Sequence, residues 1–307
     1  MSSSSAVSVS AEVARAVADG RPVVALESTI ITHGLPRPRN LAAAAEAEAL
    51  LRDAGVVPAT VGVVGGRAVV GLTGAELERL AAGERVEKVS VRDLPVVVAR
   101  GVDGGTTVAA TALLAHRAGI GVFATGGLGG VHRGAATTFD ESADLVALAG
   151  VPILVVSAGV KSILDVPATL ERLETLNVTV LGYRTDAFPG FYVRDAGVPV
   201  PARVEDAAGA AAVVRARDAL GLRSAVLLAN PIAAEAQLDV GEHRAVLDAA
   251  LARAAEQGIA GHDTTPFLLD HVHRATQGRS LEVNLAVYRG NVALAGEVAT
   301  ALSGPRP

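Results

Sequence analysis

The chain has 307 residues, a net charge of −5 at pH 7 and a pI near 5.8, and half of its residues are apolar. The acidic balance predicts no basic face and argues against nucleic-acid binding. Because there is no cysteine, disulfides, thiolate metal ligands and cysteine nucleophiles are excluded.

Residues 1–10 are rich in serine, and we expect a disordered tail there. The N-terminal segment lacks the basic region and apolar core of a signal peptide. No apolar stretch reaches the roughly 20 residues that a membrane-spanning helix needs. We therefore expect a cytoplasmic protein without a membrane partner, with residues 11–307 forming a single domain.

Short apolar runs alternate along the chain with alanine-rich amphipathic stretches. The predicted strands are Pro22–Leu26, Ala59–Val64, Pro95–Ala99, Gly121–Thr125, Ile153–Ser157, Thr179–Tyr183 and Ala225–Ala229. The predicted helices are Pro38–Ala54, Gly74–Ala82, Thr107–Ala118, Asp140–Ala149, Val166–Leu176, Val204–Leu220, Gly241–Gln257, Thr265–Thr276 and Leu281–Leu302. This alternation predicts an α/β fold with a mostly parallel sheet covered on both faces. A local hairpin over Ala68–Gly71 would make the sheet mixed.

Only two lysines, Lys88 and Lys161, stand against twenty-five arginines. A lysine amine can lose its proton and attack a carbonyl carbon, whereas an arginine cannot. Lys161 lies in VVSAGVKSILD, where an apolar run ends in a tight turn. It is a candidate nucleophile, although both lysines could equally be surface residues without a special role.

Glu27 follows the first predicted strand, in apolar surroundings. Such a carboxyl group can have a raised pKa and serve as a general acid. The alternative is a carboxylate that caps a helix or pairs with an arginine.

Two glycine-rich segments follow predicted strands. Gly104–Val108 is expected to open a helix whose first N–H groups suit a phosphate, with Thr107 and Val108 at its start, although an ordinary helix cap has the same pattern. The block from Gly126 to Gly134 indicates close backbone approach to a ligand, or else a flexible loop. Its His132 adds a titratable group.

Asp140 and Asp144 are four residues apart, so a helix would place them on one face. Two such carboxylates suit Mg²⁺ or Mn²⁺, although acidic residues also favour a first helical turn. Asn284 lies inside an apolar stretch, where its amide could read a base edge or be satisfied within a helix.

Seven motifs occur in order between about residues 20 and 302: ESTIITHGLP, GGLGGVHRGA, TFDESADL, SAGVKSILD, GYRTDAFPGFY, ANPI and TPFLL followed by SLEVNLA. Together they resemble the pseudouridine-5′-phosphate glycosidase family. The resemblance implies a homotrimeric, manganese-dependent α/β/α enzyme, with a three-layer fold, that splits the C–C bond between ribose and uracil to give ribose 5-phosphate and uracil.

Carried over by position, Lys161 would form an imine with the sugar C1′ and Glu27 would donate and accept protons. Asp140 would bind Mn²⁺, with Mg²⁺ as an alternative. The implied substrate contacts are Lys88, Thr107, Val108, Thr125, His132, Ser142, Ala143, Asp144 and Asn284.

Five positions depart from the family pattern as we expect it, namely Glu141, Ala187, Ala233, Ala234 and His262. Two other functions remain open: an imine-forming lyase or aldolase acting on another phosphosugar, and a phosphosugar-binding protein without catalytic activity.

Overall fold

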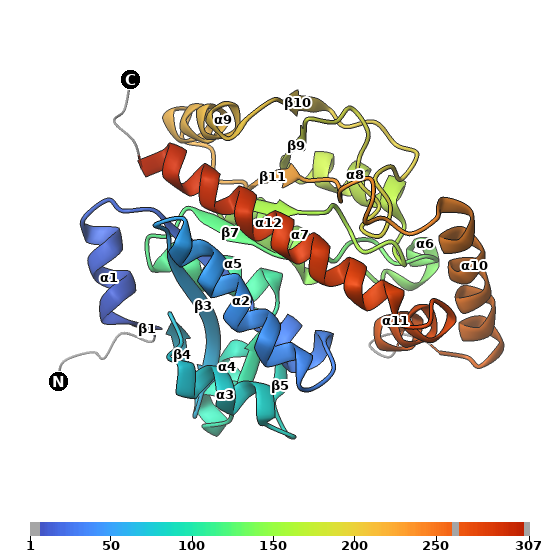
Figure 1. Cartoon of the computed structure of the whole chain (residues 1–307), viewed down its shortest axis with the longest axis horizontal. Helices are drawn as coiled ribbons and strands as arrows, with labels where there is room; N and C mark the ends of the chain where they lie inside the picture. Colours follow the sequence, from blue (N-terminus) through green and yellow to red (C-terminus); the bar gives the residue numbers. More distant parts are fainter. Residues whose placement is uncertain (1–6, 260–263, 304–307) are drawn as a thin grey trace.

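The computed structural model describes residues 7–259 and 264–303. Its described part contains one eleven-stranded sheet (Figure 1). The main path runs in the order β1 (Val7–Val9), β4 (Arg67–Val70), β3 (Val57–Val64), β2 (Val23–Leu26), β7 (Val122–Ala124), β8 (Leu154–Ser157), β11 (Val226–Ala229), β9 (Thr179–Tyr183) and β10 (Ala202–Val204). A branch is formed by β6 (Gly104–Thr106), which pairs with β3, and β5 (Glu87–Val89), which pairs with β6. Among the strands of the described chain, only β4 and β6 pair antiparallel, both with β3, and the other pairings in the sheet are parallel.

Side chains of β2 alternate between two separate apolar cores, one on each face of the sheet. Val23 and Ala25 pack on one face, and Val24 and Leu26 on the other. The first face is covered by α1 (Ala11–Ala18), α5 (Val108–Arg117), α7 (Ala143–Gly150) and α8 (Val166–Thr175), with contributions from α10 (Val240–Glu256) and α11 (Thr264–Ala275). The second face is covered by α2 (Arg39–Asp53), α3 (Gly74–Ala82), α9 (Ala207–Ala219) and α12 (Arg279–Ser303). The predicted three-layer α/β/α fold with a mixed, mostly parallel sheet is confirmed.

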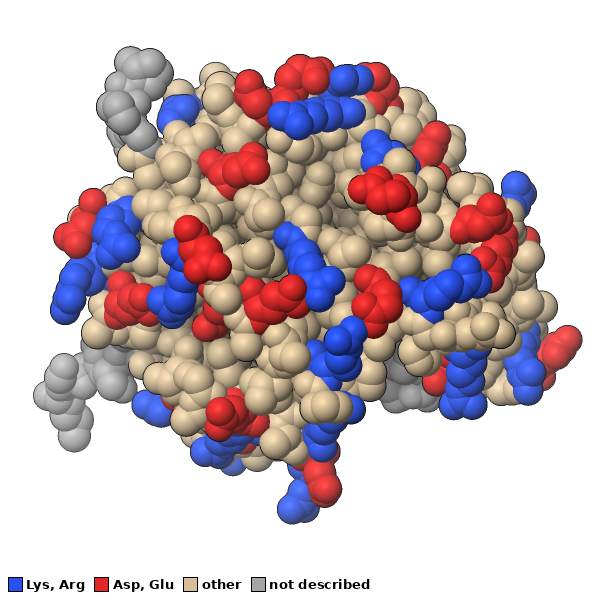
Figure 2. Space-filling view, in the orientation of Figure 1, with Lys and Arg blue, Asp and Glu red and all other residues tan. Residues whose placement is uncertain are grey.

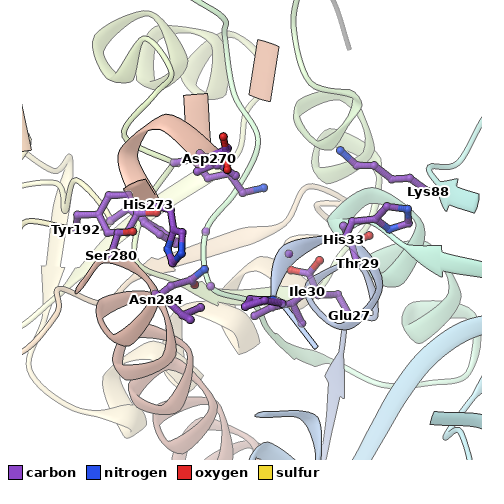
Figure 3. A pocket seen from close by; sticks show the side chains of 18 residues that line it. Glu27, Thr29, Ile30, His33, Lys88, Tyr192, Asp270, His273, Ser280 and Asn284 are labelled. Carbon is purple, nitrogen blue, oxygen red and sulfur yellow. The ribbon is translucent and has the colours of Figure 1, made fainter. Parts of the chain in front are cut away.

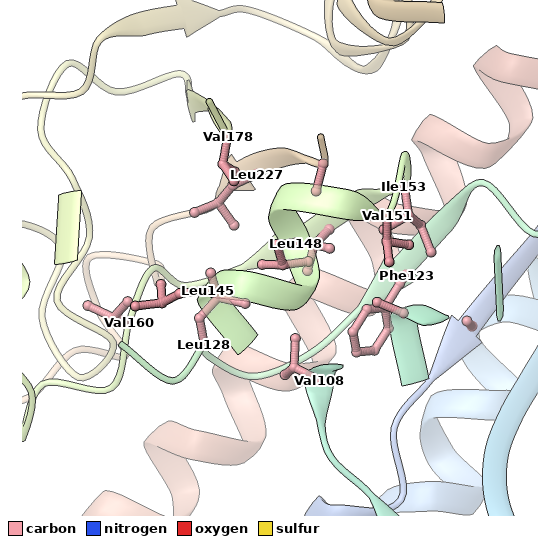
Figure 4. Packing of buried hydrophobic residues seen from close by; sticks show 14 of the residues in the cluster. Val108, Phe123, Leu128, Leu145, Leu148, Val151, Ile153, Val160, Val178 and Leu227 are labelled. Carbon is pink, nitrogen blue, oxygen red and sulfur yellow. The ribbon is translucent and has the colours of Figure 1, made fainter. Parts of the chain in front are cut away.

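The long helix α12 lies beside α2 across this second face (Figure 1). On the first face, Leu145 and Leu148 of α7 pack against Val108 and Phe123 (Figure 4). Burial of a leucine or phenylalanine side chain stabilises a fold by about 1.5–3 kcal/mol. This packing fixes the start of α5 and the end of β7, which both approach the site described below.

The prediction of a strand over Pro95–Ala99 is wrong, because Leu94–Arg100 forms the short helix α4. Proline fits the first turn of a helix, and Gly101, with φ of 66°, ends it. Val97 is buried, whereas Val96 and Val98 are 47 % and 40 % exposed. The apolar run over Val96, Val97 and Val98 therefore predicted a buried strand wrongly, because only Val97 faces the core.

Three further expectations need correction. Val7–Val9, expected within a disordered tail, form β1 against β4, and residues 1–6 lie outside the described part. Gly104–Thr106, expected to open a helix, form β6, and the helix begins at Val108. The helix predicted from Asp140 begins at Ala143.

Lysine and arginine side chains intermix with aspartate and glutamate on the visible face (Figure 2). Within residues 7–259 and 264–303, no helix combines the length and apolarity needed to cross a membrane.

Candidate active site

A cavity of about 380 Å³ opens where β2, β7 and β8 end, and α11 and α12 form its other wall. This is the edge at which parallel α/β sheets bind ligands. Figure 3 shows Glu27, Thr29, His33 and Lys88 on one side, facing Asp270, His273, Tyr192, Ser280 and Asn284 on the other. Lys161 also lines the cavity. The structure thus brings together Glu27, Lys88, Lys161 and Asn284, which are far apart in the sequence.

Glu27 is held at the end of β2 and is 8 % exposed. Burial raises the pKa of its carboxyl group, while the Lys161 ammonium and the hydroxyl of Thr125 oppose that rise. Thr125 is fully buried and its hydroxyl donates a hydrogen bond to Glu27 Oε1. Thr125, a predicted substrate contact, is not among the residues lining the cavity, and its hydroxyl is engaged with Glu27 instead.

The next residue, Ser28, braces this strand end. Its hydroxyl donates to the Val61 carbonyl at 2.6 Å and accepts from the Thr106 N–H at 2.9 Å. The chain then forms one π-helical turn over Ile30–Gly34, a local structure that is frequent at functional sites. Thr29 and His33 of this segment line the cavity.

Lys161 follows β8 in a tight turn. Its N–H donates to the Leu128 carbonyl at 3.1 Å, and its own carbonyl accepts from Leu164 at 3.0 Å. Lys88 faces the same cavity from β5. Its pKa is lowered, mainly by desolvation and to a smaller extent by repulsion from Lys161. Two amines and the Glu27 carboxyl group therefore share one electrostatic environment.

The glycine block packs tightly against neighbouring side chains. A methyl group added to Gly127 would lie 2.6 Å from Phe191, one added to Gly129 would lie 2.2 Å from Ser142, and one added to Gly130 would lie 2.5 Å from Thr169. Close contact with the protein's own side chains therefore explains these glycines and argues against a flexible loop. Their approach to a ligand stays a prediction. Gly126 and Gly127 line the cavity.

Asp144 cross-links this loop to α5. Its Oδ1 accepts the Ala109 N–H and its Oδ2 accepts the Gly129 N–H, each at 2.9 Å. Since α7 begins after Asp140, the two aspartates do not share a helix face, and the predicted carboxylate pair is wrong. Ser142 caps α7 by accepting the Asp144 N–H at 3.2 Å, and Ala143 is the exposed first residue of that helix.

Thr107 and Val108 mark the start of α5. The Thr107 hydroxyl caps the helix by accepting the Ala110 N–H. The Val108 side chain is 3 % exposed and packs in the apolar core (Figure 4), and Val108 is not among the residues lining the cavity. Only its backbone is left to meet a ligand.

The expected metal has few possible ligands. Asp140 Oδ2 lies 3.8 Å from His132 Nδ1, and its side chain is 36 % exposed. Among the described residues, no three His, Cys, Asp or Glu side chains gather as a metal site. Mg²⁺ typically keeps several waters and binds one or two carboxylates. The single Asp140 carboxylate therefore fits a hydrated hard cation and does not form a closed protein cage.

The departures from the family pattern that lie within the described residues are not among those lining the cavity. Glu141 pairs with Arg172 at 2.8 Å, so its charge is already balanced. Ala187 forms an isolated bridge with Pro199. His262 lies outside the described residues.

Several cavity residues were not predicted from the sequence, namely Thr29, His33, Phe191, Tyr192, Asp270, His273 and Ser280. Thr29 and His33 belong to the segment that follows Glu27, so their position was the available signal. His273 stands two residues from His271, a spacing that indicates no metal site and says nothing about a cavity wall.

Comparison with known proteins agrees with this architecture. Residues 12–301 match the family model described as indigoidine synthase A like protein. The chain is 67 % identical to a protein of Saccharopolyspora erythraea named pseudouridine-5′-phosphate glycosidase, covering 96 % of this chain and 98 % of that one. It is 58 % identical to a protein of the same name from Frankia alni, covering 98 % and 83 %.

Two solved structures are also similar. The prealnumycin C-glycosynthase AlnA, in complex with ribulose 5-phosphate, superposes with a TM-score of 0.91 at 42 % identity over 97 % of both chains. An indigoidine synthase A-like protein from Thermotoga maritima has a TM-score of 0.88 at 37 % identity, again over 97 % of both. The chain therefore belongs to the indigoidine synthase A-like family, and within it to the pseudouridine-5′-phosphate glycosidases, as its motifs indicated.

Proposed function

We propose that this protein reversibly cleaves the C–C glycosidic bond of pseudouridine 5′-phosphate, giving ribose 5-phosphate and uracil. The observation that carries the proposal is the position of Glu27 and Lys161 in one cavity, where the charge of Lys161 acts on the pKa of Glu27. The names of the most similar relatives support the substrate.

The chemistry explains why a lysine is needed. An ordinary glycosidase protonates a leaving heteroatom with one of two carboxyl groups. In a C-nucleoside the leaving atom is C5 of uracil, so an electron sink must form at C1′ instead. Attack of Lys161 Nζ on C1′ provides one, because the resulting amine can become an iminium as the C–C bond breaks.

The steps balance with the residues present. The C1′–O4′ bond breaks as O4′ takes a proton from Glu27 and Lys161 Nζ bonds to C1′. The new Lys161 nitrogen, now a cation, gives one proton to the Glu27 carboxylate and so regains a lone pair. That lone pair forms the iminium while the C1′–C5 bond breaks, and uracil C5 takes the proton from Glu27. Water finally hydrolyses the imine, releasing ribose 5-phosphate and free Lys161.

Lys88 is suited to bind the phosphate, since it faces the cavity from β5 as a flexible point charge. Asn284, on the opposite wall, presents both a donor and an acceptor for the uracil edge (Figure 3). Such remote contacts supply binding energy for the reaction at C1′.

We also propose that Mn²⁺, or Mg²⁺ in its place, binds at Asp140 with water completing its shell. When bound, such an ion supplies positive charge for phosphate or water oxygens. The homotrimer and the contacts of His132, Ser142, Ala143 and Asp144 with substrate remain predictions.

The test is incubation with pseudouridine 5′-phosphate and Mn²⁺, with and without EDTA, followed by chromatography for uracil. Metal-dependent release of uracil is expected. Borohydride in the same mixture should add the mass of a reduced ribose 5-phosphate adduct to a peptide containing Lys161. If pseudouridine 5′-phosphate releases no uracil, but ribose 5-phosphate with borohydride gives an adduct on Lys161, a lyase or aldolase on another phosphosugar is indicated. Neither uracil nor an adduct points to a binding protein.

A further inference from the structure

Asn291 lies on α12, is 1 % exposed and is not among the residues lining the cavity. Its Nδ2 donates to the Thr125 carbonyl at 2.8 Å and to the Gly126 carbonyl at 3.1 Å. Its Oδ1 accepts from Asn230 Nδ2 at 3.0 Å. Both amide protons and the oxygen of this buried side chain are thus used.

These two carbonyls mark the point where β7 ends and the glycine block begins. The Thr125 N–H donates a hydrogen bond to the Val156 carbonyl, and the Thr125 hydroxyl donates one to Glu27. Gly126 lines the cavity beside Asn284, whose Oδ1 would lie 3.5 Å from an added methyl group. Asn291 therefore holds, through two hydrogen bonds, the backbone that lies between Glu27 and Asn284, the predicted uracil contact.

We propose that Asn291 is a positioning residue, which holds the Thr125 backbone so that the Thr125 hydroxyl stays on Glu27. The inference rests on the proposed function for its kinetic meaning. Burial raises the pKa of Glu27, and the hydrogen bond from the Thr125 hydroxyl lowers it. If the hydroxyl loses its alignment, the pKa of Glu27 should therefore rise further. A positioning error well below 1 Å is enough to slow such a reaction.

The groups that act on Glu27 come from several elements, and apart from Thr125 none of them is a hydrogen-bond partner of Asn291. Lys161 follows β8, Lys88 lies on β5 and Asp144 on α7. Tyr288, one turn before Asn291 on α12, is buried and also feels the Glu27 charge. Any change in Glu27 titration on substitution of Asn291 can thus be assigned to the Thr125 contact.

The chain offers a matched control in Asn40 on α2. This asparagine is 3 % exposed and also donates through Nδ2 to two backbone carbonyls, those of Ile31 at 2.8 Å and Ala81 at 3.0 Å. Asn40→Leu removes the same number and type of hydrogen bonds without touching Thr125. It separates a general loss of stability from an effect on Glu27.

The experiment follows protonation of Glu27 by infrared spectroscopy of its carboxyl band, assigned by its absence in Glu27→Gln. In Asn291→Leu the midpoint should move to higher pH, Thr125→Val should reproduce that move, and the double variant should add nothing. Asn40→Leu should keep the original midpoint. With pseudouridine 5′-phosphate, kcat of Asn291→Leu should fall about tenfold with little change in KM.

Equal movement of the midpoint in Asn291→Leu and Asn40→Leu, or none in either, overturns the proposal. If Asn291→Leu does not fold, Asn230→Ala serves in its place, because losing the Asn230 hydrogen bond frees the Asn291 amide to rotate. The midpoint of Glu27 should then move to higher pH by a smaller amount. An unmoved midpoint in Asn230→Ala counts equally against the role of Asn291. Absence of uracil release by the unmodified protein would refute the proposed function alone, since the titration needs no turnover.

Discussion

The ammonium group of Lys161 lowers the pKa of Glu27, while burial raises it. The nucleophile and the acid–base group of the proposed mechanism are therefore coupled before any substrate arrives. A substitution of Lys161 therefore acts on the pKa of Glu27 as well as removing the amine, and a variant that tests the chemistry must keep the positive charge.

Lys161→Arg makes this separation. Arginine keeps a cation near Glu27 but cannot form an imine. We expect a folded protein that still binds ribose 5-phosphate and has lost at least about 1,000-fold in turnover. Uracil release and borohydride trapping measure the loss. Turnover within tenfold of the original chain would contradict an imine on Lys161.

Glu27→Gln tests the burial of the carboxyl group. A carboxyl group whose pKa is raised by folding takes up a proton on folding, so stability falls as pH rises above its unfolded value. We expect Glu27→Gln to have a higher free energy of unfolding than the original chain at pH 7. The difference should vanish below about pH 4, where both states are protonated. Urea unfolding at both pH values checks this, and a lower stability at pH 7 would show that the charge is favourable.

Gly127→Ala tests the close approach of the glycine block to Phe191. The added methyl group would lie 2.6 Å from the ring, so the ring or the backbone must shift. We expect a loss of about 1–3 kcal/mol in stability and a raised KM. Gly126→Ala is the matched control, because its nearest neighbours would be 3.5 Å away. Equal melting temperatures for the two variants would refute the steric explanation.

Asp144→Asn tests the cross-link between α5 and the glycine block. An asparagine has one oxygen and cannot accept both the Ala109 and Gly129 N–H groups. We expect a loss of about 1–3 kcal/mol in free energy of unfolding without substrate present. Ser142→Ala, which removes only the cap of α7, should cost about 1 kcal/mol. An Asp144→Asn variant as stable as the original chain would leave substrate binding as its main role.

Asp140→Asn tests the proposed metal. A single carboxylate with waters binds a cation loosely, and a neutral amide binds it more weakly still. We expect about a tenfold higher Mn²⁺ concentration for half-maximal activity, and weaker Mn²⁺ binding by electron paramagnetic resonance. Unchanged Mn²⁺ binding would place the ion elsewhere.

The layers were predicted well from the sequence, because the spacing of apolar residues indicates which face of each helix or strand is buried. Thr179–Tyr183 and Gly74–Ala82 were placed with their observed bounds, and the hairpin partner of β3 was anticipated. Glu27 was identified because it directly follows an apolar strand, and Lys161 because it is one of only two lysines and follows an apolar run. Their shared cavity followed only from the family resemblance and the parallel sheet.

The missed features depend on long-range contacts. The short strands β5 and β6 are held by pairing with each other and with β3, not by an apolar pattern of their own. The metal-pair hypothesis failed because Asp140 precedes the helix by three residues, and helix starts are hard to place from sequence. Asn291 carries no local signal, since its partners Thr125 and Gly126 are more than 160 residues away.

One helix near the end of the described chain carries three side chains of this region. Asn284, Tyr288 and Asn291 all lie on α12, whereas Glu27 lies just after β2. During synthesis, the acid–base group thus leaves the ribosome long before the helix that seats its supporting loop. Contacts so distant in sequence form slowly, and the nascent chain should expose this strand edge until residue 303 has emerged. Because Ser280, Leu281 and Asn284 of α12 line the cavity opposite Glu27, the cavity is complete only once this C-terminal helix has docked on the sheet.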